Sequence, residues 1–491
     1  MSTVFVRDKF GSREYNFHGE VNLLAFLREQ GISLQATCGG LGLCGKCEVL
    51  LRMGTTEKKV LACHTTIHES CEIILPGDEA DLSWNKAATD TVVAAGRVGL
   101  GAAVDLGTTT VALQLYDLST GADLGCISQW NMQKSYGADV ITRIGYCADN
   151  AGGLAELQNG IQTQVFTSLK DLCAQNGRAL GEVKEIFLAG NTVMQHIFAG
   201  LSPVSIASAP FAPGSYFERD ETVSLQGIPV HLSPCVAGYV GGDITAGILA
   251  VGLQNRRGKT LFIDVGTNGE MVLGDAGGFV ACAVASGPAF EGAGITCGMP
   301  AANGAVHRVY RVGDQLAYEV LGGGEPKGLC GSGLLDLMAC LLELGLVDAS
   351  GRLAKSENGA YYLTDRVYLT QKDIRQLQLA KAAIAAGIKL LLAEEKLSLA
   401  DVDSLCLAGG FGNRLNPASA VQIGMLPAEL SGKIKTVGNA CLAGAEAALL
   451  NPVRRAELLN IKNQCRYIEL SVSAAFNQQF LEEINFPGKE L

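Results

Sequence analysis

Alternating hydrophobic and polar residues at the start of the chain predict a β-hairpin. The runs STVFVRD and EYNFHGEV, within residues 2–21, alternate as strands do when one face packs on a core. The next stretch, VNLLAFLREQGISLQATC (21–38), has the apolar spacing of an amphipathic helix followed by a short irregular run. KCEVLLRMG and CEIILPG then indicate two further strands. Residues 1–76 are therefore expected to form a small α+β domain.

The pattern then changes twice along the chain. Residues 77–101 lose the apolar periodicity, which predicts a linker. From residue 102 onward, strand-like and helix-like runs alternate over long distances, which is typical of an α/β fold. We expect residues 102–258 to form a first lobe, and residues 259–491 to form a second lobe with a C-terminal segment.

The α/β part contains an internal repeat. AAVDLGTTTVALQLYD (102–117) and LFIDVGTNGEMVLGD (261–275) both consist of a strand, an Asp-x-Gly-Thr turn and a second strand. Each copy is followed by an apolar strand that runs into a Leu-Ala-Gly turn, in IFLAGNTV (186–193) and LCLAGGFG (405–412). Two copies of the same order of elements predict a duplicated fold with a cleft between its lobes.

Composition and charge narrow the classes of partner. The chain has 38 Lys and Arg against 49 Asp and Glu, a net charge of −11, which argues against a nucleic-acid partner. The start lacks the pattern of a signal peptide, and the chain lacks an uncharged apolar stretch of about 18 residues, so we expect no membrane span. The 16 scattered cysteines fit a reducing cytoplasm better than a secreted disulfide framework. Isolated arginines such as Arg143 are expected either to be solvated or to contact phosphates or acidic partners.

A glycine-rich loop carries the most specific chemistry of the N-terminal part. Three cysteines lie on this loop and a fourth lies further along the chain, with the spacing C-x5-C-x2-C-x15-C. The plant-type [2Fe–2S] pattern is C-x4-C-x2-C with a distant fourth cysteine. Glycines allow the backbone to wrap closely around such a cluster. The pattern therefore predicts a [2Fe–2S] centre bound by Cys38, Cys44, Cys47 and Cys63.

Other interpretations of this loop are weaker. CGGLGLCGKC (38–47) also matches G-x-G-x-x-G and most of a P-loop, but both motifs require a preceding strand and a following helix. A structural zinc site would need two C-x2-C pairs, and the second candidate pair, Cys63 and Cys71, is separated by seven residues. Cys71 is the rival fourth ligand, but it stands in a strand-like run, where a cysteine more often belongs to the core.

The two Asp-x-Gly-Thr turns predict a nucleotide site. Such turns offer backbone amides and hydroxyls to phosphate oxygens. Asp105 and Asp264 can hold hydrated Mg²⁺ and orient a water that attacks the γ-phosphate of ATP. The expected phosphate-binding residues are Thr108, Thr109 and Thr110 in the first turn and Gly266, Thr267 and Asn268 in the second, with Gly409, Gly410 and Gly412 as the surface for adenosine.

These motifs resemble those of the superfamily that contains sugar kinases, heat-shock chaperones and actin (ASKHA). Together with the cysteine loop, the chain is similar to the reductive activators of corrinoid proteins. The resemblance covers nearly the whole chain, and further stretches that carry it are NMQKSYGADVITRI (131–144), AGNTVMQHIFAGLSP (189–203), SGPAFEGAGITCGM (286–299), GLCGSGLLD (328–336) and VGNACLAGAEAAL (437–449). It implies a duplicated α/β, actin-like ATPase domain of two lobes, joined to an N-terminal [2Fe–2S] domain (residues 1–76) with an α+β ferredoxin-like (β-grasp) fold.

The resemblance also implies a reaction and partners. The expected activity is ATP-dependent, one-electron reduction of cob(II)alamin to cob(I)alamin through the [2Fe–2S] cluster. The implied partners are a corrinoid protein, a low-potential donor such as a ferredoxin or flavodoxin, and a second copy of the chain. Three alternatives stay open: an ATP-driven reductase of another low-potential partner, a redox-sensing nucleotide-binding module, and a small-molecule kinase with a regulatory ferredoxin domain.

Overall fold

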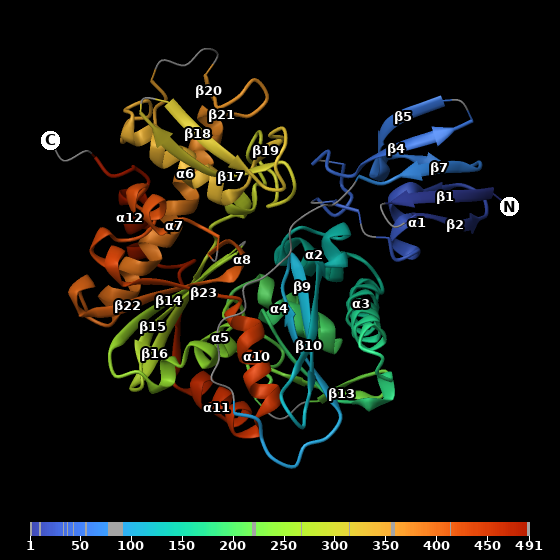
Figure 1. The fold of residues 1–491 in the computed structure, drawn as a ribbon, viewed down its shortest axis with the longest axis horizontal. Helices are drawn as coiled ribbons and strands as arrows, with labels where there is room; N and C mark the ends of the chain where they lie inside the picture. Colours follow the sequence, from blue (N-terminus) through green and yellow to red (C-terminus); the bar gives the residue numbers. More distant parts are fainter. Residues whose placement is uncertain are drawn as a thin grey trace. The chain divides into compact units, whose positions relative to one another are not determined.

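The computed structural model of the chain (Figure 1) divides into two units. The first comprises Met1–Asp78 and Ala95–Leu232, and the second comprises Glu79–Ala94 and Ser233–Leu491. Most of the predicted linker, residues 77–91, lies outside the described part of the chain. The structure describes residues 2–8, 11–32, 34–36, 38–42, 44–54, 56–76, 92–218, 222–266, 268–313, 315–354, 359–412 and 414–488.

The N-terminal part of the first unit is the predicted α+β domain. Its mixed sheet has the order β2-β1-β7-β4-β5, in which the first and last strands in sequence, β1 and β7, run parallel side by side. The hairpin and the helix predicted from the sequence are both present. The elements are β1 (Ser2–Asp8), β2 (Gly11–Phe17), β3 (Val21–Asn22), α1 (Leu23–Glu29), β4 (Glu48–Met53), β5 (Thr56–Leu61), η1 (Ala62–His64), β6 (Thr66–Ile67) and β7 (Cys71–Ile74).

The apolar pattern explains how this domain packs. Alternate residues of β1, Val4 and Val6, are fully buried, and Leu23 and Leu27 of α1 pack into the same cluster. Asn22 caps the helix by accepting a hydrogen bond from the amide of Ala25 at 3.2 Å. The fold expected for the N-terminal domain is therefore present, and its bounds at residues 1–76 stay a prediction.

The rest of the first unit is a lobe built on a six-stranded sheet of order β10-β9-β8-β11-β13-β12. Its first strand begins at Leu100, two residues before the predicted start of the lobe. The elements are β8 (Leu100–Leu106), β9 (Thr110–Asp117), β10 (Asp123–Trp130), η2 (Met132–Ser135), α2 (Val140–Asp149), α3 (Gly153–Gln175), η3 (Leu180–Glu182), β11 (Val183–Gly190), α4 (Thr192–Ala199), η4 (Val204–Ala207), β12 (Thr222–Leu225) and β13 (Ile228–Leu232).

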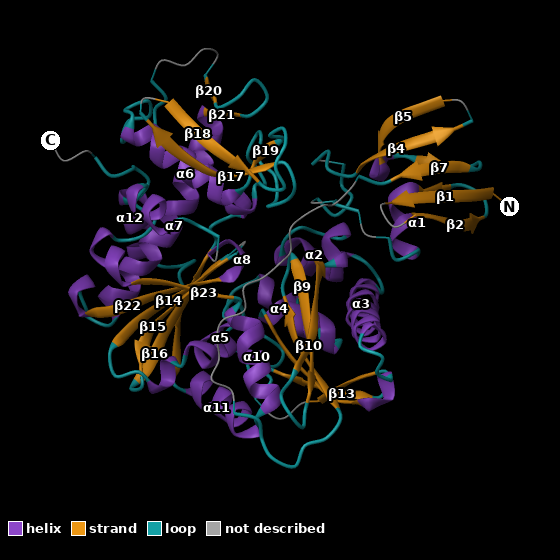
Figure 2. Ribbon diagram, viewed as in Figure 1, coloured by secondary structure: helices purple, strands orange, loops and turns teal. Residues whose placement is uncertain are grey.

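The second unit has its own six-stranded sheet, of order β23-β22-β14-β15-β16-β24 (Figure 2). The strands of this sheet are β14 (Lys259–Val265), β15 (Gly269–Asp275), β16 (Gly278–Val284), β22 (Val402–Ala408), β23 (Ile434–Gly438) and β24 (Cys465–Ile468). Smaller strands are β17 (Ala305–Val312), β18 (Gln315–Val320), β19 (Gly328–Leu329), β20 (Ala360–Tyr362) and β21 (Tyr368–Thr370). The helices are α5 (Gly242–Val251), η5 (Leu253–Asn255), η6 (Pro288–Glu291), α6 (Gly331–Glu343), α7 (Gln371–Glu394), η7 (Leu399–Asp401), α8 (Gly409–Gly412), α9 (Pro417–Gln422), η8 (Ala428–Lys433), α10 (Ala440–Leu450), α11 (Pro452–Asn463) and α12 (Ala474–Glu482).

The predicted duplication is confirmed by strand pairing. In the first sheet β8 pairs antiparallel with β9 and parallel with β11, and in the second β14 pairs antiparallel with β15 and parallel with β22. Asp105 stands opposite Ala189 and Ala112, while Asp264 stands opposite Ala408 and Glu270. The two lobes therefore place their aspartates at equivalent positions, with different residues opposite them.

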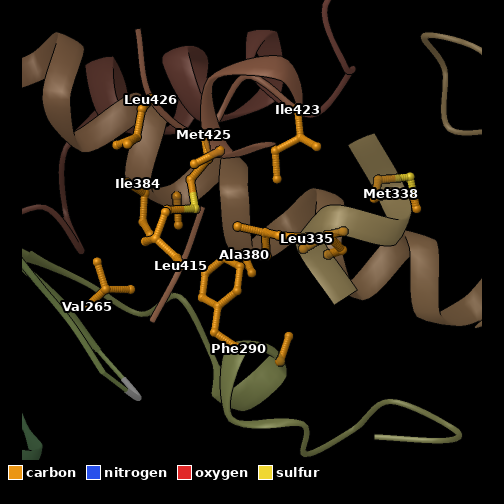
Figure 3. Packing of buried hydrophobic residues seen from close by; sticks show 14 of the residues in the cluster. Val265, Phe290, Leu335, Met338, Ala380, Ile384, Leu415, Ile423, Met425 and Leu426 are labelled. Carbon is orange, nitrogen blue, oxygen red and sulfur yellow. The ribbon is translucent and has the colours of Figure 1, made fainter. Parts of the chain in front are cut away.

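A large hydrophobic core holds the second unit together (Figure 3). It combines strand residues such as Val265 with helix residues such as Leu335 and Ile384 and with Phe290 from η6. Among the described helices, α7 is long and apolar enough to cross a membrane by length and composition. However, 78% of its most apolar 18-residue window is buried inside the protein, and a core helix passes the same test, so this is weak evidence for a span.

Candidate functional site

The predicted cluster ligands lie on a loop between α1 and β4 and on η1. No strand precedes this loop and no helix follows it directly in the described chain, so the two nucleotide-binding motifs that it spells lack their structural context. The thiols of Cys47 and Cys63 lie 3.2 Å apart, and the amide of Ala62 donates to the carbonyl oxygen of Cys47 at 2.9 Å. The fold therefore joins the loop to the segment that carries the distant fourth cysteine.

Cys38 and Cys44 lie near this pair. Burial, the hydrogen bond with Cys47 and the charges of the other three cysteines raise the pKa of the Cys63 thiol to about 11. Across the described parts of the chain, no three His, Cys, Asp or Glu side chains are gathered closely enough to hold a single metal ion. A [2Fe–2S] cluster instead spreads four thiolates over two irons.

The glycines of the loop give it the backbone that a cluster needs. Gly39 and Gly42 both have φ in the left-handed region, at 68° and 78°. A Cβ on Gly42 would lie 2.4 Å from Nε2 of His64, and one on Gly39 would lie 2.9 Å from the carbonyl oxygen of Tyr136. The donor set and the close approach of the backbone fit an iron–sulfur cluster, and the assignment of the four ligands stays a prediction.

The rival ligand Cys71 has a different environment. It lies in β7, is 5% exposed and belongs to the domain's hydrophobic core. Burial, with a smaller contribution from Glu69, raises the pKa of its thiol to about 11. These features are typical of a structural core cysteine.

The first Asp-x-Gly-Thr turn, which is predicted to bind phosphate and is called here the first phosphate loop, connects β8 to β9. Its turn is closed by the amide of Gly107, which donates to the carbonyl oxygen of Thr110 at 3.0 Å. A Cβ on Gly107 would lie 2.7 Å from that oxygen, so the turn requires glycine. Asp105 is partly exposed near the end of β8, Thr108 and Thr109 lie on the loop, and Thr110 begins β9.

Three side chains that sequence reasoning did not assign to the site hold this loop. Asn131 donates through Nδ2 to the carbonyl oxygen of Gly107 at 2.8 Å. Asn191, the N-cap of α4, donates to Oγ1 of Thr108 at 2.9 Å. Arg143 of α2 donates through Nη2 to the carbonyl oxygen of Thr108 at 2.6 Å. These residues lie in or next to stretches that carry the family resemblance, and that resemblance was the one feature of the sequence that could have pointed to them.

Arg143 is fully buried, so the expectation that it is solvated is wrong, whereas a contact with phosphate stays a prediction. Its Nε also donates to the carbonyl oxygen of Gly137 at 3.1 Å, and Nη1 approaches Oε1 of Gln133 at 3.3 Å. Burial lowers the pKa of its guanidinium to about 9, partly offset by the charge of Asp139. Its hydrogen bonds to backbone oxygens make it a structural support for the phosphate loop.

The second phosphate loop connects β14 to β15 and is accompanied by further carboxylates. Glu270, opposite Asp264 in the sheet, is only 9% exposed. Burial, followed by the charges of Asp243 and Asp264, raises the pKa of its carboxyl group well above the usual range, while a hydrogen bond with Asn268 opposes this shift. The charges of three carboxyl groups therefore interact near this loop, although these groups are not gathered closely enough to hold a single metal ion between them.

The glycine-rich motif LAGGFG also lies beside this aspartate. Gly409 begins the short helix α8 directly after β22, with φ at 87°. A Cβ there would lie 2.4 Å from Oδ1 of Asp264, which explains the glycine. Gly410 and Gly412 lie on the same short helix, so this motif forms a helical turn. The amide of Gly266 donates to the carbonyl oxygen of Asn268 at 2.9 Å, and the remaining predicted residue, Thr267, lies outside the described residues.

Three family models match consecutive parts of the chain. Residues 7–68 match a 2Fe-2S iron-sulfur cluster binding domain, residues 100–256 match the RACo middle region, and residues 258–491 match the C-terminal domain of RACo, described as the ASKHA domain. Among solved structures, the chain is similar to one described as a reductive activator for corrinoid, iron-sulfur protein, with 31% identity, a TM-score of 0.71, and coverage of 100% of this chain and 99% of that one. The chain belongs to the reductive activators of corrinoid proteins.

Two curated relatives agree with this membership. The corrinoid activation enzyme RamQ of Eubacterium limosum is 33% identical over 67% of this chain and 60% of its own length. A [Co(II) methylated amine-specific corrinoid protein] reductase of Methanosarcina barkeri is 24% identical over 67% of this chain and 66% of its own length. The aligned part thus spans about two thirds or less of each relative.

The family matches bear on two sequence predictions. The iron–sulfur model covers Cys63 and ends before Cys71, which favours Cys63 as the fourth ligand. The models divide the lobes near residue 257, close to the predicted boundary, whereas the first compact unit ends at Leu232. The boundary between the lobes therefore stays a prediction.

Proposed function

We propose that this member of the family reactivates a corrinoid protein by reducing its cob(II)alamin to cob(I)alamin, and that ATP supplies the free energy for this reduction. The observation that carries the proposal is the combination, in one chain, of a four-cysteine glycine loop and a duplicated Asp-loop fold, along with 31% identity to an activator over the whole chain. The reduction takes one electron from a low-potential donor, which is oxidised, and delivers it to cobalt. When bound, a [2Fe–2S] cluster supplies one-electron transfer between donor and cobalt.

The residues of the chain have separate roles in this proposal. Cys38, Cys44, Cys47 and Cys63 hold the cluster. The hydroxyls and amides of the two phosphate loops bind the phosphates of ATP, and Asp105 and Asp264 hold hydrated Mg²⁺ and orient water. Asn131, Arg143 and Asn191 keep the first loop in its shape, because each one is hydrogen-bonded to it.

ATP is required on thermodynamic grounds in this proposal. We infer from the family resemblance that a [2Fe–2S] centre of ordinary potential does not reduce cob(II)alamin at equilibrium, so the cobalt equilibrium must be shifted. A nucleotide can shift it only if it binds more tightly to the state of the protein that contacts the corrinoid partner. A cytoplasmic location, a ferredoxin or flavodoxin donor and a homodimer stay predictions.

The experiment is an anaerobic assay of corrinoid reduction. The full chain with its cluster is mixed with a corrinoid protein in the cob(II)alamin state and a low-potential reductant, with and without Mg-ATP, and cob(I)alamin is followed by absorption. We expect cob(I)alamin only with ATP, and its loss in Cys44→Ala and Asp264→Ala. Matched controls are Cys126→Ala and Asp171→Ala, which change exposed residues on β10 and α3.

The outcomes separate the candidate functions. Cluster formation and ATP cleavage without reduction of any corrinoid protein would favour an ATP-driven reductase of another partner. Cluster formation and nucleotide binding without any effect of ATP on electron transfer would favour a redox-sensing module.

A further inference from the structure

The ferredoxin-like domain contacts its lobe through residues 131–137, NMQKSYG, called here the 131–137 segment. It begins at Asn131, continues through η2 and ends at Gly137. Both parts belong to the same compact unit. The amide of Leu34, shortly before the cluster loop, donates to Oγ of Ser135 at 3.1 Å, and Ser135 is 1% exposed.

Arg28, in the last turn of α1, joins the cluster loop to this segment. Its Nη2 donates to the carbonyl oxygen of Gly39 at 2.9 Å and also to the carbonyl oxygen of Ser135. Its guanidinium lies over the ring of Tyr136, 4.6 Å from the ring centre, a distance typical of a cation–π contact. Gly39 directly follows the predicted ligand Cys38, so Arg28 touches the cluster loop itself.

The same segment is also hydrogen-bonded to the first phosphate loop. Asn131 donates to the carbonyl oxygen of Gly107 through its side chain and to that of Thr109 through its amide, at 2.8 and 2.9 Å. Arg143 donates hydrogen bonds to the carbonyl oxygens of both Thr108 and Gly137, and so connects the loop to the segment. Breaking these bonds would leave a buried guanidinium without its acceptors, which is strongly unfavourable. The segment and the phosphate loop are therefore expected to move as one body.

We propose that the 131–137 segment couples the two sites, so that nucleotide at the first phosphate loop and the docking of the cluster loop stabilise one another, with Arg28 and Ser135 as the positioning residues. This inference rests on the proposed function, because it assumes that the phosphate loop binds nucleotide. Binding energies are linked reciprocally, so a nucleotide that tightens docking must itself bind more tightly to the docked state. The contacts form one contiguous network of hydrogen bonds, the kind of element that can carry such coupling.

The test is hydrogen exchange of the cluster-loaded full chain, with and without the Mg²⁺ complex of a non-hydrolysable ATP analogue. The amide of Leu34 reports docking directly, because it is bonded to Ser135. We expect the analogue to slow exchange at Leu34 and in the 131–137 segment by at least several-fold. In Arg28→Met and Ser135→Ala the slowing at Leu34 should be lost, while the peptide that contains Thr108 stays protected.

Two further variants separate coupling from simple destabilisation. Arg28→Lys keeps the charge but cannot hold both carbonyl oxygens with the planar geometry of a guanidinium, so it should lose most of the effect. Arg7→Met changes an exposed arginine on β1 of the same domain and should behave as wild type. Absorption of the cluster and circular dichroism check that each variant is loaded and folded.

The affinity for the analogue gives a second measurement, by titration calorimetry. We expect Arg28→Met to bind it several-fold more weakly than Arg7→Met, because the nucleotide no longer gains from docking. Unchanged exchange at Leu34 in a wild-type protein that binds the analogue would overturn the coupling and leave the proposed function intact. No binding of the analogue at millimolar concentration would overturn the proposed nucleotide site and the coupling with it.

Discussion

The guanidinium of Arg143 donates a hydrogen bond of 2.6 Å to the carbonyl oxygen of Thr108, in the middle of the first phosphate loop. The side chain has no exposed surface; two further hydrogen bonds go to Gly137 and Gln133, in the segment that contacts the ferredoxin-like domain, and another goes to Sδ of Met194. A charge buried in this way is stable only while its hydrogen bonds are made. These hydrogen bonds therefore hold the loop in its observed shape.

Replacing this arginine should damage both stability and nucleotide binding. Arg143→Met leaves the carbonyl oxygens of Thr108 and Gly137 without this donor, which should lower the free energy of unfolding by about 2–4 kcal/mol. Nucleotide affinity should fall at least tenfold. Chemical denaturation and calorimetry measure the two effects. Arg308→Met is the control, because Arg308 is exposed and its ion pair with Glu319 contributes little. Equal effects in both variants would contradict the assigned role.

The identity of the fourth cluster ligand can be tested with two serine variants. Cys63→Ser should lose the [2Fe–2S] absorption and most of the bound iron, because Cys63 contacts Cys47 on the cluster loop. Cys71→Ser should keep the cluster and lose some stability, because Cys71 is packed in the core of the domain. Iron content and visible absorption decide between them. Loss of the cluster in Cys71→Ser, in protein that is still folded, would reverse the assignment.

The pH dependence of stability should reveal the buried carboxyl group of Glu270. Because the folded-state pKa of Glu270 is raised, the native state holds this proton more tightly than the unfolded chain above about pH 4.5. Stability therefore falls as the pH rises through this window towards the folded-state pKa, by up to about 1.4 kcal/mol per pH unit. Glu270→Gln removes this titration.

Denaturation of both proteins between pH 4.5 and 8, without Mg²⁺, measures the effect. The variant should become progressively more stable than wild type as the pH rises. Mg²⁺ with an ATP analogue should reduce this difference, because a cation favours the ionised carboxylates of Asp243, Asp264 and Glu270. A difference that does not depend on pH would mean that Glu270 keeps an ordinary pKa.

The close approach of α8 to Asp264 can be tested at Gly409. Gly409→Ala places a methyl group 2.4 Å from Oδ1 of Asp264 in a backbone conformation that alanine rarely adopts. The strain should cost about 1–3 kcal/mol of stability and displace the aspartate, so ATP cleavage should fall by more than tenfold. Gly432→Ala is the control, because a Cβ there meets no atom within 4 Å. If Gly409→Ala cleaved ATP at the wild-type rate, the position of Asp264 would not matter for catalysis, which would contradict its proposed role.

The sequence alone predicted much of the architecture. Apolar alternation located the first hairpin, and the repeated Asp-x-Gly-Thr turns revealed the duplicated lobes, because strand periodicity and glycine turns are local properties of the chain. Cysteine spacing indicated the cluster loop for the same reason: three of its four candidate ligands lie within ten residues.

Only the tertiary structure showed what surrounds these motifs. Nothing in the spacing of Arg143 relates it to Thr108, which is 35 positions earlier, and nothing local distinguishes this buried arginine from a solvated one. Likewise, the charges that act on Glu270 come from α5 and β14, and Arg28 meets Ser135 across 107 positions. A motif consists of residues that are neighbours along the chain. The burial of a side chain, its pKa and its hydrogen-bond partners depend instead on which distant segments the fold packs together.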